Sequence, residues 1–308
     1  MLAAALAPAV AQQQKGAKAE KPPRTADIAN GTYGPEQRNV FDLWKAKSGH
    51  PTPLVIFIHG GAFLHGDKSQ VDALLIDLCL KRGISVAAIN YRYSTIAPYP
   101  APFMDAAHAV QYFRLHASEL NLDKRAFGAT GGSAGAGISL WLGFHDDLAK
   151  PSSSNPLERE STRLSAMAVR NAQSTYDPRT IARLIDDKTA HIEALQQLFD
   201  VKSGDPLHAT EAFKRYEEGS AVTHLTKDDP PVFMEYAQNN TSMPPSSPGN
   251  GIHHPRFGYF LKERMDKLGI ECVVKVKSDY EGRSAAQRQI DIVEFLAKYL
   301  QPAASARR

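Results

Sequence analysis

The chain has 308 residues, of which 43% are hydrophobic and 22% charged, and its mean hydropathy is −0.35. This composition is typical of a globular protein with one large or two small domains, and it excludes a disordered chain. The 36 Lys and Arg residues against 33 Asp and Glu give a net charge of only +3. Without a basic cluster, that charge gives no support to nucleic-acid binding. No apolar run reaches the roughly 18 residues of a membrane span, and Cys79 and Cys272 read as buried free thiols.

Segments with strand and helix patterns alternate along the chain. Leu54 to Ile58 is continuously apolar, as in a buried parallel strand, and the helix pattern from Pro255 to Leu268 is followed by the C-cap residue Gly269. In chain order we expect a strand at 39–44, a strand at 54–58, a helix at 72–81, a strand at 85–90, a helix at 102–120, a strand at 125–130, a helix at 136–144, a strand at 164–169, a helix at 180–198, a strand at 231–236, a helix at 255–268, a strand at 271–276 and a helix at 285–300. This alternation predicts an α/β protein with a mainly parallel sheet covered on both faces.

The N-terminus starts with a short apolar run that ends in Ala9-Val10-Ala11, a pattern typical of signal-peptide cleavage sites. Because a basic n-region is missing, we interpret the run as a signal-peptide remnant, with an alanine-rich tail as the alternative. The remnant predicts a periplasmic or secreted protein. The expected organisation is a remnant at 1–11, a disordered linker at 12–30, one domain at 31–302 with cap segments at about 151–163 and 180–226, and a tail at 303–308.

Gly131, Ser133 and Gly135 form a G-x-S-x-G motif between a predicted strand and a predicted helix. This context is what a nucleophile elbow requires, because the strained turn between strand and helix exposes the serine hydroxyl. The N–H of Ala134, at the start of the helix, would point at a developing oxyanion. Ser133 is therefore the candidate nucleophile.

The run His59-Gly60-Gly61-Ala62-Phe63 directly follows the buried strand at 54–58. Adjacent glycines let the backbone approach a bound carbonyl group and direct N–H groups toward it, as in an HGGG-type oxyanion loop. Gly60 and Gly61 are therefore candidate oxyanion-hole residues together with Ala134. His59 itself is better interpreted as a residue that supports the loop than as a catalytic base.

Three segments, PLVIFIHGGAF, INYRYSTIAPYPAPFMDAAHAV and GATGGSAGAGISL, together resemble the α/β-hydrolase fold. Within it they are similar to esterases and lipases with an HGG-type oxyanion loop, near the hormone-sensitive-lipase-like and the feruloyl and acetyl esterase branches. The resemblance covers roughly residues 35 to 300. It implies a central, mainly parallel sheet flanked by helices, with a small cap, and acyl-ester chemistry. It also implies that Tyr91, Arg92 and Asp105 brace the structure near the site.

The usual partners of the serine are missing. A serine nucleophile needs a base, and the base needs an orienting acid. In the fold that this chain resembles, the acid follows the strand that corresponds to 231–236, and the histidine follows the last strand. Here Asn239 and Asn240 stand where the acid is expected, and none of the eleven histidines lies beyond His254. The usual triad therefore cannot be present.

His253 and His254 offer a substitute base, because their loop emerges from the strand that normally carries the acid. Pro255 suits the first position of a helix, which would make His254 the N-cap. A helix N-terminus disfavours an imidazolium ion and so keeps such a ring able to accept a proton. The alternative is that both histidines only cap the helix and pack the loop. A metal site at this pair is not expected, since adjacent residues rarely bind one ion.

Asp279, after the last predicted strand, could orient this base, so that base and acid would have exchanged loops. Such an exchange is allowed because triads are defined by geometry rather than by chain order. Asp177 is a second candidate acid and Glu281 a third.

Two functions follow from these residues. The first is a serine carboxylesterase that hydrolyses a small-molecule or polysaccharide-linked acyl ester without a cofactor or metal; only the resemblance suggests a short acyl group and a polysaccharide. The second is an impaired or non-catalytic α/β-hydrolase that binds a ligand or a partner, which the missing acid and histidine favour. The sequence does not indicate the oligomeric state.

Overall fold

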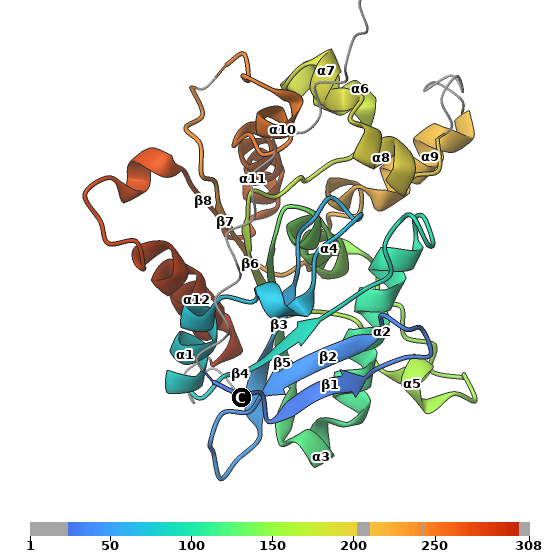
Figure 1. Cartoon of the computed structure of the whole chain (residues 1–308), viewed down its shortest axis with the longest axis vertical. Helices are drawn as coiled ribbons and strands as arrows, with labels where there is room; N and C mark the ends of the chain where they lie inside the picture. Colours follow the sequence, from blue (N-terminus) through green and yellow to red (C-terminus); the bar gives the residue numbers. More distant parts are fainter. Residues whose placement is uncertain (1–23, 202–209, 242, 302–308) are drawn as a thin grey trace, which may run out of the picture.

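The computed structural model describes residues 24–201, 210–241 and 243–301, which form an eight-stranded sheet with helices around it (Figure 1). The strands are β1 (Ile28–Thr32), β2 (Val40–Trp44), β3 (Thr52–Ile58), β4 (Ser85–Ile89), β5 (Leu122–Gly132), β6 (Ala166–Arg170), β7 (Val232–Glu235) and β8 (Cys272–Lys275). Their order across the sheet is β1-β2-β4-β3-β5-β6-β7-β8. The pairs β1–β2 and β2–β4 are antiparallel and all other pairs are parallel. The predicted α/β class with a mainly parallel sheet is confirmed.

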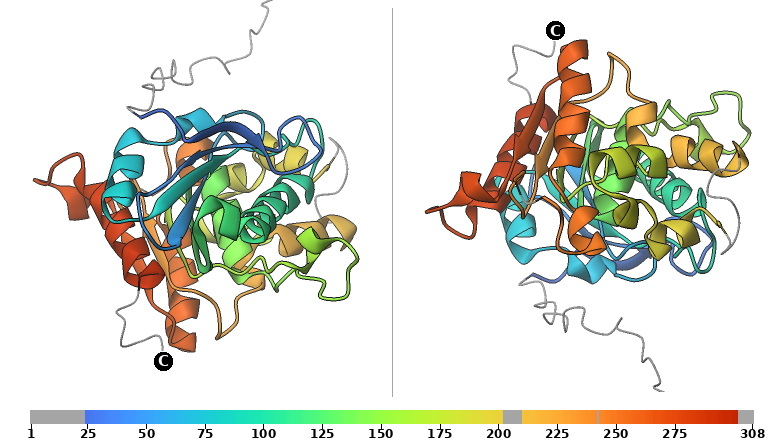
Figure 2. Two further views of the ribbon diagram at one scale, coloured as in Figure 1. Left: turned by 90° about the horizontal axis from the view of Figure 1, so that it is seen from below. Right: turned by 90° about the horizontal axis from the view of Figure 1, so that it is seen from above.

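Two helical layers cover the sheet because its central strands are apolar on both faces. Along β3, Leu54, Ile56 and Ile58 belong to one apolar cluster, whereas Val55 belongs to the cluster on the other side. The first cluster includes α2 (Ala101–Leu115), α4 (Ala134–Phe144) and α11 (Arg256–Leu268), and the second includes α1 (Ala73–Lys81) and α12 (Gln287–Leu300). The views from below and above show α1 and α12 together on one side of the sheet (Figure 2).

The remaining elements refine the predicted order. The helix expected at 102–120 is interrupted at His116 and continues as α3 (Ala117–Leu120), and the one expected at 180–198 is three helices, α6 (Pro178–Leu184), α7 (Asp187–Ala190) and α8 (Glu193–Leu198). Strand β1 was not predicted, and it begins within the expected linker at 12–30. The helices α9 (Thr210–Gly219), α5 (Pro156–Arg159) and α10 (Pro248–Gly251) were not predicted either, nor were the 3₁₀ turns η1 (Lys68–Gln70), η2 (Ala221–Thr223) and η3 (Lys277–Tyr280).

Only one of the two predicted cap segments lies over the carboxyl ends of the strands. The helices α6 to α9 leave the carboxyl end of β6 and lie at the top of Figure 1. The other segment, at 151–163, packs against the C-terminal half of α2, where the side chains of Gln111 and Arg114 donate to the carbonyl groups of Glu160 and Ser161. This segment lies away from the elbow because α4 begins at the elbow, at the carboxyl ends of the strands, and runs back toward their amino ends. The prediction of a cap at 151–163 is therefore wrong.

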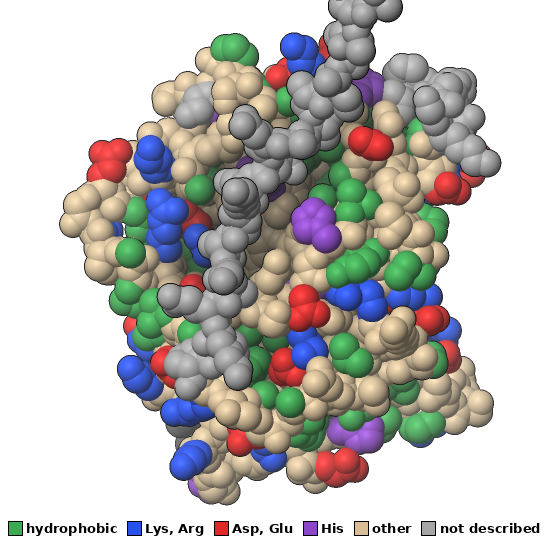
Figure 3. Space-filling model, in the orientation of Figure 1, with side chains coloured by type: hydrophobic (Ala, Val, Ile, Leu, Met, Phe, Trp, Pro, Cys, Tyr) green, Lys and Arg blue, Asp and Glu red, His purple; other side chains and the backbone are tan. Residues whose placement is uncertain are grey.

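Several predictions concern the ends and the surface. Those for residues 1–11 and 303–308, and for most of the linker, lie outside the described residues. Cys79 and Cys272 are buried free thiols, as predicted. Acidic and basic side chains are interspersed on the face drawn in Figure 3. Within the described ranges, no helix combines the length and the apolar character needed to cross a membrane.

Candidate active site

Ser133 occupies the sharp turn between β5 and α4. Its backbone has φ 52° and ψ −119°, a strained conformation for a residue with a side chain. The N–H of Ser133 donates to the carbonyl of Arg170 at 3.0 Å, which fixes the turn to the end of β6. Gly135 is pressed against β3, since a Cβ atom there would lie 2.0 Å from the carbonyl oxygen of Ile58. The turn thus has the geometry of a nucleophile elbow.

The loop after β3 lies against this elbow. A Cβ atom on Gly60 would lie 2.8 Å from the carbonyl oxygen of Gly132 and 3.6 Å from Cβ of Ser133, so only glycine allows so close an approach. The next three residues, Gly61-Ala62-Phe63, all have positive φ angles. Ala134 is the first residue of α4, where backbone N–H groups lack partners within the helix. The loop after β3 and the first turn of α4 thus meet at the Ser133 elbow.

His59 supports this loop. Its ring stacks on Tyr91 with 4.3 Å between the ring centroids, and its Nδ1 donates to the carbonyl of Gly60 at 2.7 Å. Burial lowers the pKa of His59 to about 4, so the ring is neutral and its Nε2 can accept from Arg38 at 3.3 Å. The bracing contacts implied by the resemblance are also present, because the Tyr91 hydroxyl donates to the carbonyl of His59 and Arg92 forms an ion pair with Asp105.

His253 reaches the serine. Its Nε2 lies 2.8 Å from Oγ of Ser133, across 120 residues of sequence. Burial lowers the pKa of the His253 imidazole, and a hydrogen bond to the backbone carbonyl of Gly249 opposes that shift. Because Nε2 faces the serine, this second contact falls to Nδ1. A proton held on Nδ1 by a carbonyl leaves the lone pair of the neutral ring on Nε2, directed at the hydroxyl.

His254, the adjacent residue, has a different environment. Its side chain is fully buried, and its Nδ1 accepts the backbone N–H of Arg256 at 3.2 Å. The N-cap of α11 is Pro255, so the prediction that His254 is the N-cap is wrong by one residue, although His254 does accept an N–H of the first turn. Of the two candidate bases, the structure brings only His253 to the serine, whereas His254 packs the start of α11.

The candidate acids have other partners. Asp177 caps α6 through the N–H of Arg179 and forms an ion pair with its guanidinium at 2.7 Å. Asp279 accepts the N–H of Val276 at 2.8 Å, in the turn η3 that projects to the left of the sheet in Figure 1. Glu281 is exposed. Among the described residues, no hydrogen bond or ion pair joins these three carboxylates to His253.

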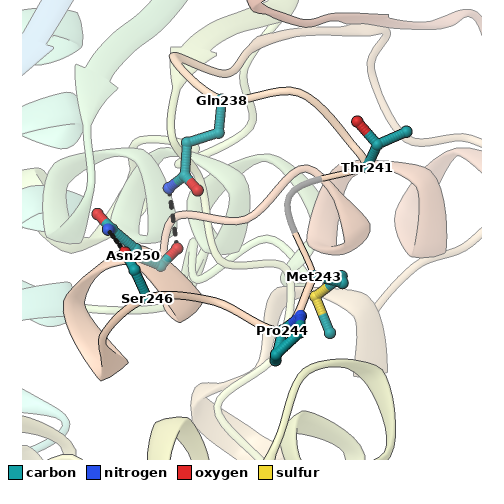
Figure 4. A pocket seen from close by; sticks show the side chains of 6 residues that line it. All are labelled: Gln238, Thr241, Met243, Pro244, Ser246 and Asn250. Carbon is teal, nitrogen blue, oxygen red and sulfur yellow. Dashed lines mark hydrogen bonds between the residues drawn. The ribbon is translucent and has the colours of Figure 1, made fainter.

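The two loops that would normally supply acid and base are bonded to each other. Asn239, at the expected acid position, accepts the N–H of Ser278 from the loop after β8 at 2.8 Å. Gln238 donates to the carbonyl of Asn250 at 2.9 Å and so supports α10, the turn that carries Gly249 (Figure 4). The side chains drawn in Figure 4 line an open cavity of about 380 Å³: Gln238, Thr241, Met243, Pro244, Ser246 and Asn250. The segment after β7 is thus bonded to α10 and to the loop after β8.

A second cavity, of about 410 Å³, contains the reactive pair. Its wall combines Ser133, His253 and Gly60 with polar side chains and a few apolar ones. The other residues on its wall are Phe57, Gln70, Asp72, Leu75, Thr130, Gly131, Gly132, Arg170, Asn171, Gln289 and Ile292. Its volume is within the range of small-molecule binding sites.

Sequence analysis missed two parts of this site. Arg170 ends β6 and bonds through Nε to the buried carboxylate of Glu235, which ends the neighbouring β7, at 3.1 Å. Arg170 and Glu235 carry opposite charges at the carboxyl ends of two successive predicted strands, and this pattern could have predicted an ion pair beside the site. Gly249 contributes only its carbonyl group, for which the sequence carries no side-chain signal.

Known proteins with related sequences are esterases. The chain is 29% identical over 223 residues to a probable carboxylic ester hydrolase, LipM, of Mycobacterium tuberculosis, which covers 71% of this chain and 48% of the relative. It is 22% identical over 214 residues to esterase LipC of the same organism, with 69% and 51% covered. A shorter match, 28% identical over 120 residues, is to an acetyl esterase of Salmonella paratyphi B, with 38% and 33% covered. The chain thus spans about half the length, or less, of the curated relatives it matches.

Solved structures of other proteins have a fold similar to that of this chain. The thermophilic esterase Est2 of Thermogutta terrifontis superposes with a TM-score of 0.65 at 19% identity and covers 93% of this chain and 96% of its own. An acetyl ester-xyloside bifunctional hydrolase from Caldicellulosiruptor lactoaceticus gives a TM-score of 0.64 at 18% identity, with 84% and 87% covered. These similarities confirm the α/β-hydrolase fold. The sequence model of the BD-FAE family matches residues 41–248, more than half of the chain, and the chain therefore belongs to the BD-FAE family.

Proposed function

We propose that this protein is a serine carboxylesterase that hydrolyses acyl esters through an acyl-enzyme on Ser133. The observation that carries the proposal is the 2.8 Å contact between Oγ of Ser133 and Nε2 of His253, at a strained elbow beside a glycine-containing loop. Both residues line the cavity of about 410 Å³, so an ester bound there meets the nucleophile and the base together. The esterase relatives support the same chemistry.

The proposed reaction has two steps, with His253 as the proton carrier. In the first, Nε2 of His253 accepts the hydroxyl proton while Oγ of Ser133 attacks the ester carbonyl carbon. The N–H groups of Gly60, Gly61 and Ala134 stabilise the resulting oxyanion, and the leaving alkoxide takes the proton from Nε2. In the second step a water molecule repeats this sequence on the acyl-enzyme, which releases the acid and restores the serine.

The carbonyl of Gly249 replaces the usual acid in one of its two roles. It holds the proton on Nδ1, so the neutral ring presents a lone pair to the serine, and a triad without the correct tautomer loses about 10⁴-fold in rate. A neutral carbonyl stabilises the imidazolium ion less than a carboxylate does. We therefore expect a competent enzyme with a lower kcat than one with a complete triad.

We further propose a short acyl group on a small or polysaccharide-linked alcohol as the substrate, and a periplasmic or secreted location. The amide and charged side chains of Gln70, Arg170, Asn171 and Gln289 on the cavity wall suit the hydroxyl groups of a sugar better than a long alkyl chain. Among the related proteins, one is an acetyl esterase and one structural neighbour is an acetyl ester-xyloside bifunctional hydrolase. The location rests on the Ala9-Val10-Ala11 pattern alone.

The test compares the wild-type chain with Ser133→Ala and with Ser118→Ala, an exposed serine on α3, as the matched control. Hydrolysis of p-nitrophenyl acetate and butyrate should fall by about 10³-fold or more in Ser133→Ala and stay unchanged in Ser118→Ala. Diethyl p-nitrophenyl phosphate should add one diethylphosphoryl group to the Ser133 peptide, as measured by mass spectrometry. Equal, slow hydrolysis by wild type and Ser133→Ala without labelling would instead support the non-catalytic alternative.

A further inference from the structure

A second cluster of ionisable side chains lies at the far end of α4 from Ser133. His145 follows the last residue of α4, Glu218 belongs to α9, and His224 follows η2. One ligand atom from each of these three residues lies within 4.8 Å of the other two. The cluster joins the end of α4 to a segment 73 residues further along the chain, and the proposed reaction uses none of its residues.

The hydrogen bonds of His145 decide which of its nitrogens is free for a cation. Its Nδ1 lies 2.9 Å from the carbonyl oxygen of Asp146, and because a carbonyl only accepts, Nδ1 carries a proton. In the neutral ring the lone pair is then on Nε2, which lies 3.2 Å from Oε1 of Glu218. Two acceptors cannot face each other at that distance without a positive charge on or between them, so the pair requires either a second proton on His145 or a metal ion.

His224 also bonds to a backbone carbonyl, but through Nε2 where His145 uses Nδ1, which leaves Nδ1 of His224 for a cation. Its Nε2 donates to the backbone carbonyl of Glu218 at 2.7 Å, and that carbonyl also accepts the indole N–H of Trp141 at 2.9 Å. The rings of His145 and His224 lie 4.6 Å apart between centroids, and His145 also packs on Trp141. Backbone carbonyls that bind the second nitrogen of a histidine are the usual support for metal-binding imidazoles, because they fix the tautomer and the ring orientation.

We propose that His145, Glu218 and His224 form a binding site for one divalent transition-metal ion, of which zinc is the expected one. Two imidazoles and one carboxylate are a ligand set that zinc accepts, with water in the fourth position. Ligand atoms around tetrahedral zinc are about 3.4 Å apart, close to the 3.2 Å between Nε2 of His145 and Oε1 of Glu218. Because the atoms of the three residues lie within 4.8 Å of one another, the third ligand has to move inward by at most about 1.4 Å, which the exposed side chain of Glu218 allows.

The ion would have a structural role. The segment with α9 and η2 returns from the cap to the start of β7, and it bonds to α4 through Trp141 and His145. A metal ion across these residues would cross-link the cap segment to α4, the helix that begins directly after Ser133. Because the site is separate from the cavity around Ser133, the proposal stands or falls independently of the proposed esterase activity.

The experiment uses the whole chain without a histidine tag, stripped of metal with EDTA. Zinc is titrated against a chromophoric chelator, and cobalt(II) is followed by its visible absorption bands. We expect one tightly bound ion per chain and a rise in Tm of about 3–8 °C at a zinc concentration 100-fold above Kd. Trp141, one of two tryptophans, should report cobalt binding by quenching of its fluorescence.

The variants His224→Ala and Glu218→Gln should each weaken zinc binding by about 100-fold or more and remove the rise in Tm. The matched control is His116→Ala, because Nδ1 of His116 also faces a glutamate, Glu119, at 3.0 Å, but His116 belongs to no three-residue cluster of ligand atoms among the described residues. Circular dichroism checks that all variants fold. Absence of zinc binding in the wild type, or equal affinity in wild type and His224→Ala, would overturn the proposal and leave a protonated His145–Glu218 ion pair.

Discussion

The two halves of the proposed active site are built differently. From β3 to α4, the oxyanion loop and the serine elbow directly follow buried parallel strands, and their geometry depends on backbone conformation. From β7 to α12, the proposed base is His253, 18 residues beyond the end of β7, and a backbone carbonyl is its second partner. The match to the BD-FAE family ends at residue 248, just before His253.

This difference indicates that the position of the base in the chain can vary more than the position of the oxyanion hole. An oxyanion hole needs several N–H groups at fixed positions, so the loop and the elbow must keep their contacts with β3 and with each other. A base needs only one nitrogen within reach of the hydroxyl and a partner that fixes its tautomer. His253 meets both requirements from a loop, through Ser133 on one nitrogen and Gly249 on the other.

The largest expected effect is a difference in activity between variants of the adjacent residues His253 and His254. His253→Ala should lower kcat/KM for p-nitrophenyl acetate by about 10²–10⁴-fold with little change in Tm, since it removes the base from a loop. His254→Ala should keep most of the activity but lower the free energy of unfolding by about 1–3 kcal/mol, because it removes a fully buried side chain and leaves the partly buried N–H of Arg256 without its acceptor. Steady-state kinetics and urea denaturation measure the two effects. Full activity in His253→Ala would show that His253 is not the base.

The pH profile should reveal a base without a carboxylate partner. Only the neutral imidazole accepts the serine proton, and burial lowers the pKa of His253 below its ordinary value of 6.5. A lowered pKa keeps the ring neutral to more acidic pH, so the acidic limb of kcat/KM should have its midpoint below pH 6.5. A carboxylate beside the ring would raise the pKa. A midpoint of the acidic limb above about 7 would therefore contradict the role of the Gly249 carbonyl.

The smallest expected effect concerns the acids predicted from sequence. Asp177→Asn and Asp279→Asn should each change kcat/KM by less than about 3-fold, whereas the loss of a true triad acid costs about 10⁴-fold. Asparagine keeps an oxygen for the N–H groups of Arg179 and Val276, so the folded structure should be retained. A large loss of activity in either variant, with an unchanged circular dichroism spectrum, would instead identify that aspartate as the acid partner of the base.

The first half of the site was predictable because its signals are local. Gly131, Ser133 and Gly135 lie in one turn, and the run at His59 follows a strand that is apolar at every position. The second half was predictable only as a choice between His253 and His254, because a step of one residue at the start of a helix turns the side chain in another direction. The segment at 151–163 was predicted as a cap because the sequence does not show at which end of the strands a connecting segment lies.

The sequence by itself determined the α/β class, the elbow, the proposed oxyanion loop and the absence of a histidine after His254, since each of these depends on residue identity within a short segment. Only the tertiary structure decided that His253 faces Ser133 while His254 is buried, that Asp177 and Asp279 bond elsewhere, and that the carbonyl of Gly249 completes the contacts of the base. These outcomes depend on distances between segments far apart in the chain and on a backbone group that every residue possesses. Residue identity alone therefore does not encode them.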